Sequence, residues 1–367
     1  MKKRALMYAS VASMIQQFNM ANIRLLLESG YEVDVVCNLE QGSTITPEKI
    51  AAMRSELEGM GVRVIHVPIP RKISAIGEII TSFRMSRQII AQGEYSLIHC
   101  HSPIGSVLCR LANRFSGRYG KAKMIYTAHG FHFFKGAPLL NWLLFYPAEW
   151  LLAPVTDVLI TINKEDHARA LKQLHAKRIE YVPGVGIKTA KFRNLSMDRD
   201  AKRESLGYGD DDFLLLTVAE MTPNKNHITI LKALALLKER GELGKIHYLI
   251  CGRGEMWASL EQSAKEMGID DHVNFLGYRT DAPELYKASD LFLFVTLREG
   301  LSVALMEAMS SGMPIICAKI RGNTDLVDDD ISGVFSENDP EEIARHILAL
   351  YQDPEKRKSL GQAASEK

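Results

Sequence analysis

Short apolar runs and longer amphipathic segments alternate along the first half of the chain. The runs have the length of buried strands, and the segments repeat apolar residues every three or four positions, as helices do. The predicted strands are Ala5–Ala9, Val33–Cys37, Val62–Val67, Leu97–Cys100, Lys123–Thr127, Asp157–Ile162 and Ile179–Val182. The predicted helices are Ile15–Ser29, Pro47–Met60, Ile76–Ala91, Ile104–Phe115 and Lys164–Leu174. This order predicts a parallel sheet with helices on both faces.

The alternation stops at Pro183-Gly184-Val185-Gly186 and then resumes. The later predicted strands are Phe213–Ala219, Ile246–Cys251, Val273–Leu276, Leu291–Val295 and Pro314–Cys317. The helices between and after them are Asn226–Arg240, Glu255–Met267, Ala282–Ala288, Leu301–Ser311 and Pro340–Gln352. We therefore predict an α/β protein of two doubly wound, Rossmann-like domains, residues 1–183 and 194–367, joined by a linker at 184–193. Ligands of such sheets bind beyond the carboxyl ends of the strands, so we expect the domains to face each other across a cleft.

The two halves of the chain differ in charge. The 367 residues carry a net charge of +1, but residues 1–185 hold 22 Lys and Arg against 14 Asp and Glu, whereas residues 186–367 hold 23 against 30. The near-neutral total argues against a nucleic-acid partner, although the basic first half suits another anionic one. Five cysteines without a C-x-x-C pair favour the reducing cytoplasm. We expect neither a signal peptide nor a membrane span, because every apolar run is too short.

Two glutamates carry the first chemical signal. Glu299 follows a predicted strand, and Glu307 lies two turns into an apolar helix. A carboxylate inside such a helix is costly unless it is hydrogen-bonded, and a ribose diol would satisfy it. The first N–H groups of that helix favour a phosphate. The spacing alone fits a purely structural interpretation equally well. In that interpretation Glu299 is a solvated loop residue and Glu307 pairs with a lysine.

The segment that contains both glutamates, REGLSVALMEAMSSGMPIICA, resembles the signature of glycosyltransferase family 4. Further segments similar to this family extend over nearly the whole chain: HCHSPIGSVLCRLA, IYTAHGFHFFKGAP, DVLITINKEDHARA, VPGVGI, NKNH, LGYRTDAPELY and IRGNTDLV. The family contains retaining enzymes of the GT-B fold, and the likeness is to bacterial members that build capsular polysaccharide and exopolysaccharide. It implies transfer of a hexosyl or N-acetylhexosaminyl group from a nucleotide-diphosphate sugar, with UDP-sugar as the expected donor. The implied acceptor is a lipid-linked saccharide.

The resemblance also implies roles for individual residues. Glu307 would bind the ribose hydroxyls, and Glu299 would bind hydroxyls of the donor sugar. Lys225, which precedes a predicted helix, matches the lysine that neutralises the donor diphosphate; without the family it would pass for a solvated surface charge. His129, just beyond a predicted strand, would contact the donor sugar, although a lone histidine there is more often a satisfied loop residue. The backbone amides that would assist Glu299 are those of Gly300, Leu301 and Ser302.

The chain departs from the family at one phosphate contact. Many members have Gly-Arg where this chain has Ala219-Glu220, and a glutamate cannot bind phosphate as the arginine does. We expect either Arg298 or Arg321 to supply the second positive charge, or Lys225 to act alone.

Other site residues are less specific. Gly252 begins a Gly-Arg-Gly turn after a strand, and Arg279 lies where the family contacts the base; both also fit plain turn chemistry. On the acceptor side we expect Ser10, after the first strand, and His101.

A metal site is the alternative for the histidines of the first half. His99, His101, His129 and His132 lie near Cys100 in the sequence, but their spacing is loose and no carboxylate accompanies them. The D-x-D segment at 210–212 precedes its predicted strand, whereas a metal–nucleotide site would follow one, and the segments at 198–200 and 328–330 resemble solvated turns. We expect no metal and no cofactor besides the donor substrate.

The stretch Phe131 to Trp150 combines aromatic and leucine residues with basic neighbours. It resembles an interfacial element that docks on an anionic inner leaflet, and it equally fits a buried helix. The apolar residues are Trp142, Phe145, Tyr146, Trp150, Leu139, Leu140, Leu143 and Leu144, and the basic ones are Arg110, Arg114, Arg118, Lys121, Lys123 and Lys135. We expect a cytoplasmic enzyme that can associate peripherally with the plasma membrane.

Three other functions compete with glycosyl transfer. A nucleotide-sugar epimerase of the same two-domain layout would need no acceptor. An NAD-dependent oxidoreductase would need a G-x-G-x-x-G fingerprint, but the Gly252 turn has Trp257 at the last position. A binding protein would show no turnover. The sequence ends at Lys367, where we expect the final helix of the family to be shortened or missing.

Overall fold

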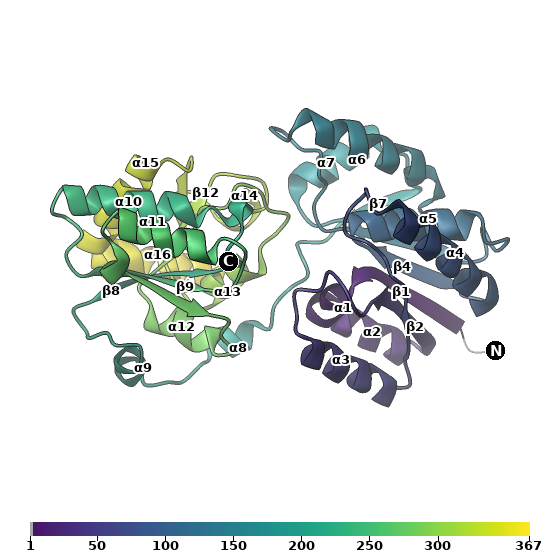
Figure 1. The fold of residues 1–367 in the computed structure, drawn as a ribbon, viewed down its shortest axis with the longest axis horizontal. Coiled ribbons are helices and arrows are strands. Elements are labelled where there is room, and N and C mark those ends of the chain that lie inside the picture. The colour runs from purple at the N-terminus through teal and green to yellow at the C-terminus, as the bar shows by residue number, and fades with distance from the viewer. Residues whose placement is uncertain (1–2) are drawn as a thin grey trace. The chain divides into compact units, whose positions relative to one another are not determined.

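A computed structural model describes residues 3–367 and divides the chain into two compact units, Met1–Val185 and Gly186–Lys367 (Figure 1). The predicted linker at 184–193 contains this division and also the short helix α8 (Thr189–Arg193) of the second unit. Among residues 3–367, none of the helices is both long and apolar enough to cross a membrane.

The first unit is built on a seven-stranded sheet with the strand order β3-β2-β1-β4-β5-β6-β7, and all neighbours in it pair in parallel. Its elements are β1 (Lys3–Val11), α1 (Ala12–Phe18), α2 (Met20–Glu28), β2 (Tyr31–Asn38), α3 (Pro47–Gly59), β3 (Arg63–His66), α4 (Ile76–Gly93), β4 (Leu97–His101), α5 (Pro103–Arg114), β5 (Lys123–Ala128), α6 (Leu139–Leu152), η1 (Ala153–Val155), β6 (Val158–Thr161), α7 (Lys164–Gln173) and β7 (Arg178–Tyr181).

Helices cover both faces of this sheet (Figure 1). Successive side chains of a strand point to opposite faces. Along β1, Ala5 and Met7 join the core beneath α1, α2 and α3, whereas Leu6 and Tyr8 join the core beneath α4, α5 and α6. The sheet is therefore buried on both sides, which is why the middle of β1 is a nearly continuous apolar run.

The prediction of one helix at Ile15–Ser29 is wrong, because two helices, α1 and α2, replace it. Asn19 lies between them and is fully buried. Its side-chain amide donates to the carbonyl of Met14 at 2.9 Å. A side chain that bonds nearby backbone in this way competes with the helical ladder, so the helix ends here and restarts.

The second unit is built on a six-stranded parallel sheet with the order β10-β9-β8-β11-β12-β13. After α8 its elements are α9 (Arg199–Ser205), β8 (Phe213–Val218), η2 (Pro223–Lys225), α10 (His227–Glu239), β9 (Ile246–Cys251), α11 (Trp257–Glu266), η3 (Asp270–His272), β10 (Val273–Gly277), α12 (Ala282–Ala288), β11 (Leu291–Phe294), α13 (Val303–Ser310), β12 (Ile315–Ala318), α14 (Asn323–Leu326), β13 (Val334–Ser336), α15 (Pro340–Gln352) and α16 (Pro354–Glu366).

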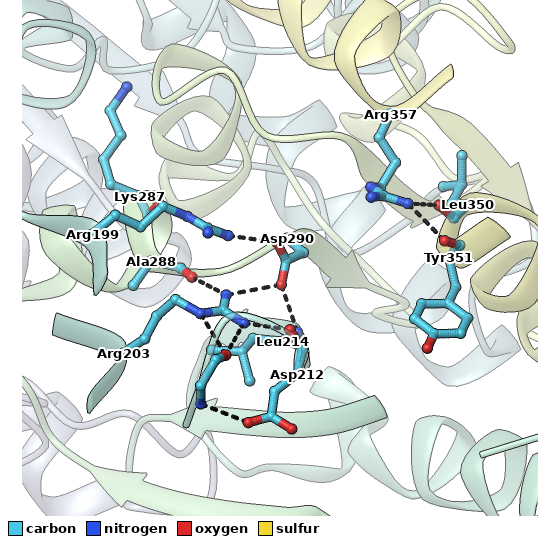
Figure 2. Close-up of polar contacts among 11 residues, drawn as sticks. Arg199, Arg203, Asp212, Leu214, Lys287, Ala288, Asp290, Leu350, Tyr351 and Arg357 are labelled. Carbon is cyan, nitrogen blue, oxygen red and sulfur yellow. Dashed lines mark hydrogen bonds and ion pairs between the residues drawn. The ribbon is translucent and has the colours of Figure 1, made fainter. Parts of the chain in front are cut away.

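A buried arginine ties α9 to the second sheet (Figure 2). Arg203 is 1% exposed and donates to the carbonyls of Ala288 and Gly209, each at 2.9 Å. It also bonds Asp290 at 3.1 Å and the carbonyl of Asp212. A charge this deeply buried is tolerated because its N–H groups have acceptors. The network connects α9 to the residues that precede β8 and β11.

Every predicted strand is present, with both ends within two residues of the prediction. Strand β13 and several helices, among them α9, α14 and α16, are present but were not predicted from the sequence. The two doubly wound, Rossmann-like sheets are confirmed.

Candidate active site

The candidate donor residues lie on loops at one edge of the second sheet. The strands β8, β9, β10 and β11 are parallel, so the loops that follow them all emerge at the carboxyl edge. The ammonium Nζ of Lys225, which follows β8, lies 2.6 Å from Oε1 of Glu299, which follows β11. The same ammonium lies 5.2 Å from the ring centre of Phe294. Two residues 74 positions apart, both predicted from the sequence, therefore meet in one ion pair.

Asparagine side chains join the two loops that carry this pair. Asn224 donates to the carbonyl of Arg298 at 3.0 Å, and its own carbonyl accepts from the N–H of Leu297 at 2.8 Å. Asn226 donates to the carbonyl of Val295 at 3.1 Å. Asn226 has φ +57°, a left-handed conformation that asparagine tolerates better than most residues. These bonds fix Lys225, which lies between the two asparagines, against the loop of Glu299.

The loop after β11 leads directly into α13. Ser302 caps this helix, since its hydroxyl accepts from the N–H of Leu305 at 3.3 Å. The first N–H groups of the helix have no intrahelical acceptor and point out of its N-terminus, where an anion is favoured. The predicted backbone amides at Gly300 and Leu301 therefore precede a genuine helix start.

Glu307 lies further along α13 and is half-buried. Its Oε2 accepts from the hydroxyl of Tyr286 at 3.1 Å. Burial raises the pKa of Glu307, and the nearby charge of Lys191 lowers it by a smaller amount. The partner observed in the structure is thus a tyrosine hydroxyl and not the lysine ion pair that the sequence left open. A carboxyl that already accepts from one hydroxyl is suited to accept from a diol as well.

Two glycines bring the loops of this edge into backbone contact. A Cβ on Gly252 would lie 1.9 Å from the carbonyl oxygen of Ala219, and one on Gly322 would lie 2.3 Å from that of Gly300. Gly322 also has φ +82°, which side chains rarely adopt. Both positions therefore require glycine, and Gly252 is part of the structural support of the β8 loop.

The arginines predicted around the donor differ in their surroundings. Arg279 forms a two-point ion pair with Asp281, at 2.8 and 2.6 Å, and this hydrogen bonding raises the arginine pKa. Its guanidinium is therefore committed to a structural pair. Arg298 is exposed and Arg321 is half-buried. The side chain of Glu220 lies at the surface.

The candidate residues of the first unit also lie at a carboxyl edge. Ser10 is the penultimate residue of β1, His101 ends β4 and His129 follows β5, and these three strands are neighbours. The hydroxyl of Ser10 accepts from the N–H of Gly105 at 3.1 Å, and a Cβ on Gly105 would lie 2.7 Å from that oxygen. Ser10 therefore anchors the first turn of α5.

His101 and His129 are directly bonded. Nδ1 of His101 lies 3.1 Å from Nε2 of His129, and the ring of His99 lies 4.2 Å from that of His101. Burial lowers the pKa of His99 and of His129 to about 4, and it lowers the pKa of His101 well below its ordinary value. The rings are therefore neutral at pH 7 and suited to donate or accept hydrogen bonds. Nε2 of His101 is buried without a hydrogen-bond partner.

The metal alternative has no geometric support in the described chain. Within residues 3–367, the structure contains no group of three or more His, Cys, Asp or Glu side chains that could hold a metal ion. His132 instead stacks on Phe145, with ring centres 4.5 Å apart.

Several residues shape these sites in ways that the sequence did not predict. Tyr286 is predicted only as part of a helix, yet it bonds Glu307. Asn224 and Asn226 appear in the family-like segments, but only the fold shows that they bridge two loops. The side chain of His99 bonds Thr127 at 2.8 Å, and its ring lies 4.2 Å from that of His101 at a tilt of 38°, a contact that the H-x-H spacing on one strand could have indicated.

Comparisons with known proteins agree with the arrangement of both units. The family model described as "Glycosyl transferases group 1" matches residues 198–367, and the "Glycosyl transferase 4-like domain" matches residues 15–184. EpsD of Bacillus subtilis (strain 168), named as a glycosyltransferase, is 35% identical over 365 residues, which is 99% of this chain and 91% of EpsD. The chain belongs to glycosyltransferase family 4. It is therefore an enzyme that transfers glycosyl groups.

Two other relatives extend the comparison. An Escherichia coli protein named "UDP-Gal:alpha-D-GlcNAc-diphosphoundecaprenol alpha-1,3-galactosyltransferase" is 26% identical over 344 residues, 92% of this chain and 85% of the relative. The crystal structure of Anabaena HepE in complex with UDP-glucose has a TM-score of 0.77 at 19% identity, covering 100% of this chain and 94% of HepE. The likeness to HepE confirms the predicted GT-B fold of this glycosyltransferase.

Proposed function

We propose that this glycosyltransferase moves a hexosyl or N-acetylhexosaminyl group from a UDP-sugar to a hydroxyl of a lipid-linked saccharide, with retention at the anomeric carbon. The observation that carries the proposal is the 2.6 Å pair of Lys225 and Glu299 before α13, with Glu307 further along that helix. The name of the E. coli relative supports both substrates, and HepE, which shares the fold, is described with UDP-glucose. The product would enter capsular polysaccharide or exopolysaccharide.

In this proposal the second unit holds the donor. The diphosphate lies at the N-terminus of α13, where it meets the first backbone N–H groups and the ammonium of Lys225. Lys225 then exchanges Glu299 for a phosphate, and the released carboxylate accepts hydrogen bonds from the sugar. Glu307 binds the ribose hydroxyls beside Tyr286. Arg298 or Arg321 supplies a further positive charge.

The proposed reaction proceeds by attack on the same face from which the leaving group departs. The bond between the anomeric carbon and the phosphate oxygen breaks, the acceptor oxygen bonds to that carbon, and the departing phosphate takes the acceptor proton. The candidate residues of the first unit, Ser10, His101 and His129, include no carboxylate to act as a nucleophile. His129, neutral at pH 7, hydrogen-bonds a sugar hydroxyl. Lys225 and the helix amides stabilise the charge on the diphosphate, and we propose that no metal is required.

The test is a panel of nucleotide sugars incubated with and without lipid-linked acceptors. Mass spectrometry would show a glycosylated acceptor, and the proton coupling at the new linkage would report its configuration. A donor converted to a second nucleotide sugar without any acceptor would instead establish the epimerase alternative. An inverted linkage would refute same-face attack.

We also propose that the enzyme works in the cytoplasm, peripherally on the inner face of the plasma membrane. A lipid-linked acceptor remains in its bilayer, so the enzyme must approach the membrane surface. The five free, buried cysteines fit a reducing compartment.

A further inference from the structure

Helix α6 presents an apolar side to solvent. Its leucines at 139, 140, 143 and 151 are 74%, 63%, 64% and 64% exposed, and Leu144 and Trp150 are each 46% exposed. Their spacing places them along one side of a helix. We call these six residues, Leu139, Leu140, Leu143, Leu144, Trp150 and Leu151, the α6 stripe. A continuous apolar surface of this kind usually marks an interaction site.

The opposite side of α6 is firmly anchored in the first unit. Arg110 and Glu149 are both buried and form an ion pair at 2.9 Å, and Tyr126 donates to the same carboxylate at 3.0 Å. The rings of Trp142 and Tyr146 lie 5.6 and 5.3 Å from that of Phe133 in the core. The expectation that Arg110, Trp142 and Tyr146 belong to an interfacial surface is therefore wrong. The α6 stripe is exposed to solvent because other side chains of the helix make its contacts with the core of the first unit.

The surroundings of the stripe are basic. Helix α7 lies beside α6 (Figure 1), with the guanidinium of Arg169 4.9 Å from the ring of Trp142. Its outer side exposes Lys164, Lys172 and Leu171, the last at 60%. Lys135, just before α6, is exposed as well.

The acidic residues of these helices are buried or engaged in contacts within the unit. Asp166 is fully buried, and Glu165 pairs with Arg169 at 2.9 Å. Glu149, the only charged residue of α6, is buried against Arg110. The outer side of α6 and α7 thus combines an apolar centre with exposed lysines.

We propose that the α6 stripe inserts into the interfacial layer of an anionic bilayer, with α6 parallel to the membrane and the neighbouring lysines on lipid headgroups. A helix of 14 residues is about 21 Å long, too short to span the hydrocarbon core, so α6 lies on the membrane. The proposal deepens the proposed function by naming the surface that meets a lipid-linked acceptor, but bilayer binding itself needs no substrate.

Charge and composition favour a bilayer over a second copy of the chain. A symmetric dimer through this surface would bring its lysines close to the same lysines of the partner copy. The stripe also offers almost no hydrogen-bonding group that could fix a protein partner in one register, whereas protein interfaces mix apolar and polar contacts.

The test is co-sedimentation of the full chain with vesicles of phosphatidylcholine alone and with 30% phosphatidylglycerol. We expect binding to the anionic vesicles, and we expect the double variant Leu143→Ser/Leu151→Ser to lower the partition coefficient at least ~10-fold. Leu25→Ser is the matched control, because Leu25 is 60% exposed on α2, over the opposite face of the same sheet. The variant Lys164→Gln/Lys172→Gln should reduce the preference for anionic lipid.

Several outcomes would overturn the proposal. The proposal is wrong if the wild-type chain binds neither kind of vesicle. It is also wrong if Leu25→Ser lowers the partition coefficient as much as the double variant does. A concentration-dependent dimer in light scattering that only the double variant abolishes would assign the stripe to a second copy. Circular dichroism checks that each variant folds. Donor turnover measured with a water-soluble acceptor should be unchanged in the double variant, which separates failure of docking from failure of glycosyl transfer.

Discussion

Replacing Lys225 with alanine tests the donor phosphate site most directly. Its side chain is 22% exposed and its partner Glu299 13%, so an effective dielectric constant of about 20 applies to charges at this position. A unit positive charge about 4 Å from the departing diphosphate then contributes about 4 kcal/mol. Because about 1.4 kcal/mol corresponds to a factor of ten in rate, we expect Lys225→Ala to lower kcat by ~10³-fold.

The partner residue gives a second, opposite effect. In the free enzyme, Lys225 must leave Glu299 before it can bind a phosphate. Partly exposed ion pairs contribute about 0.2–1 kcal/mol, so Glu299→Gln should tighten binding of UDP by up to about 5-fold. The same variant should slow transfer, because the sugar loses a carboxylate acceptor.

Isothermal titration with UDP and steady-state transfer assays measure the two effects separately. Lys232→Ala is the matched control, since Lys232 is an exposed lysine on α10 of the same unit. Transfer by Lys225→Ala within about 3-fold of wild type would refute the phosphate assignment. Weaker UDP binding by Glu299→Gln would refute the partner exchange.

Three further predictions concern stability. Arg203→Met should lower the free energy of unfolding in urea by about 3–5 kcal/mol, because it leaves buried acceptors without a donor. Arg199 is 43% exposed and pairs with the same aspartate, so Arg199→Ala should lower it by under about 1 kcal/mol. Equal losses in the two variants would contradict the proposed role of the buried network. Gly252→Ala should lose about 1–3 kcal/mol and weaken UDP binding, because its Cβ would lie 1.9 Å from a carbonyl oxygen. Burial lowers the pKa of His99 and of His129 to about 4, below the pKa of a histidine in the unfolded chain. Each histidine should therefore lower the free energy of unfolding by up to about 3 kcal/mol as the pH falls from about 6.5 to 4. Urea midpoints that stay constant between pH 7 and 5 would contradict this last prediction.

The strands were predictable because both sheets are covered on both faces. Strands of such sheets are apolar at most positions, so β8 and β9 stand out in the sequence as apolar runs interrupted only by Thr217 and His247. The ion pair between Lys225 and Glu299 follows from the same regularity, since parallel strands deliver their loops to one edge. In both cases the apolar runs in the sequence predict strands that the fold buries in a parallel sheet.

Other features depend on contacts that sequence periodicity does not contain. The break at Asn19 comes from one side-chain bond to Met14. Arg279 forms an ion pair with Asp281, two residues away, a pairing that requires a particular turn. Which side of α6 faces solvent could not be predicted either, because this helix is apolar nearly all round. Its orientation follows from the ion pair of Glu149 with Arg110 and from the packing of Trp142 and Tyr146 against Phe133.

The asparagine bonds between the two donor loops have a consequence for enzyme engineering. Asn224 and Asn226 donate hydrogen bonds to the backbone of residues 295–298. The loop after β8 and the loop after β11 should therefore move together as one rigid unit. A graft that moves only the Glu299 segment from a relative with another sugar preference would misplace Lys225 as well. Residues 220–227 and 295–302 should therefore be exchanged together as a single cassette.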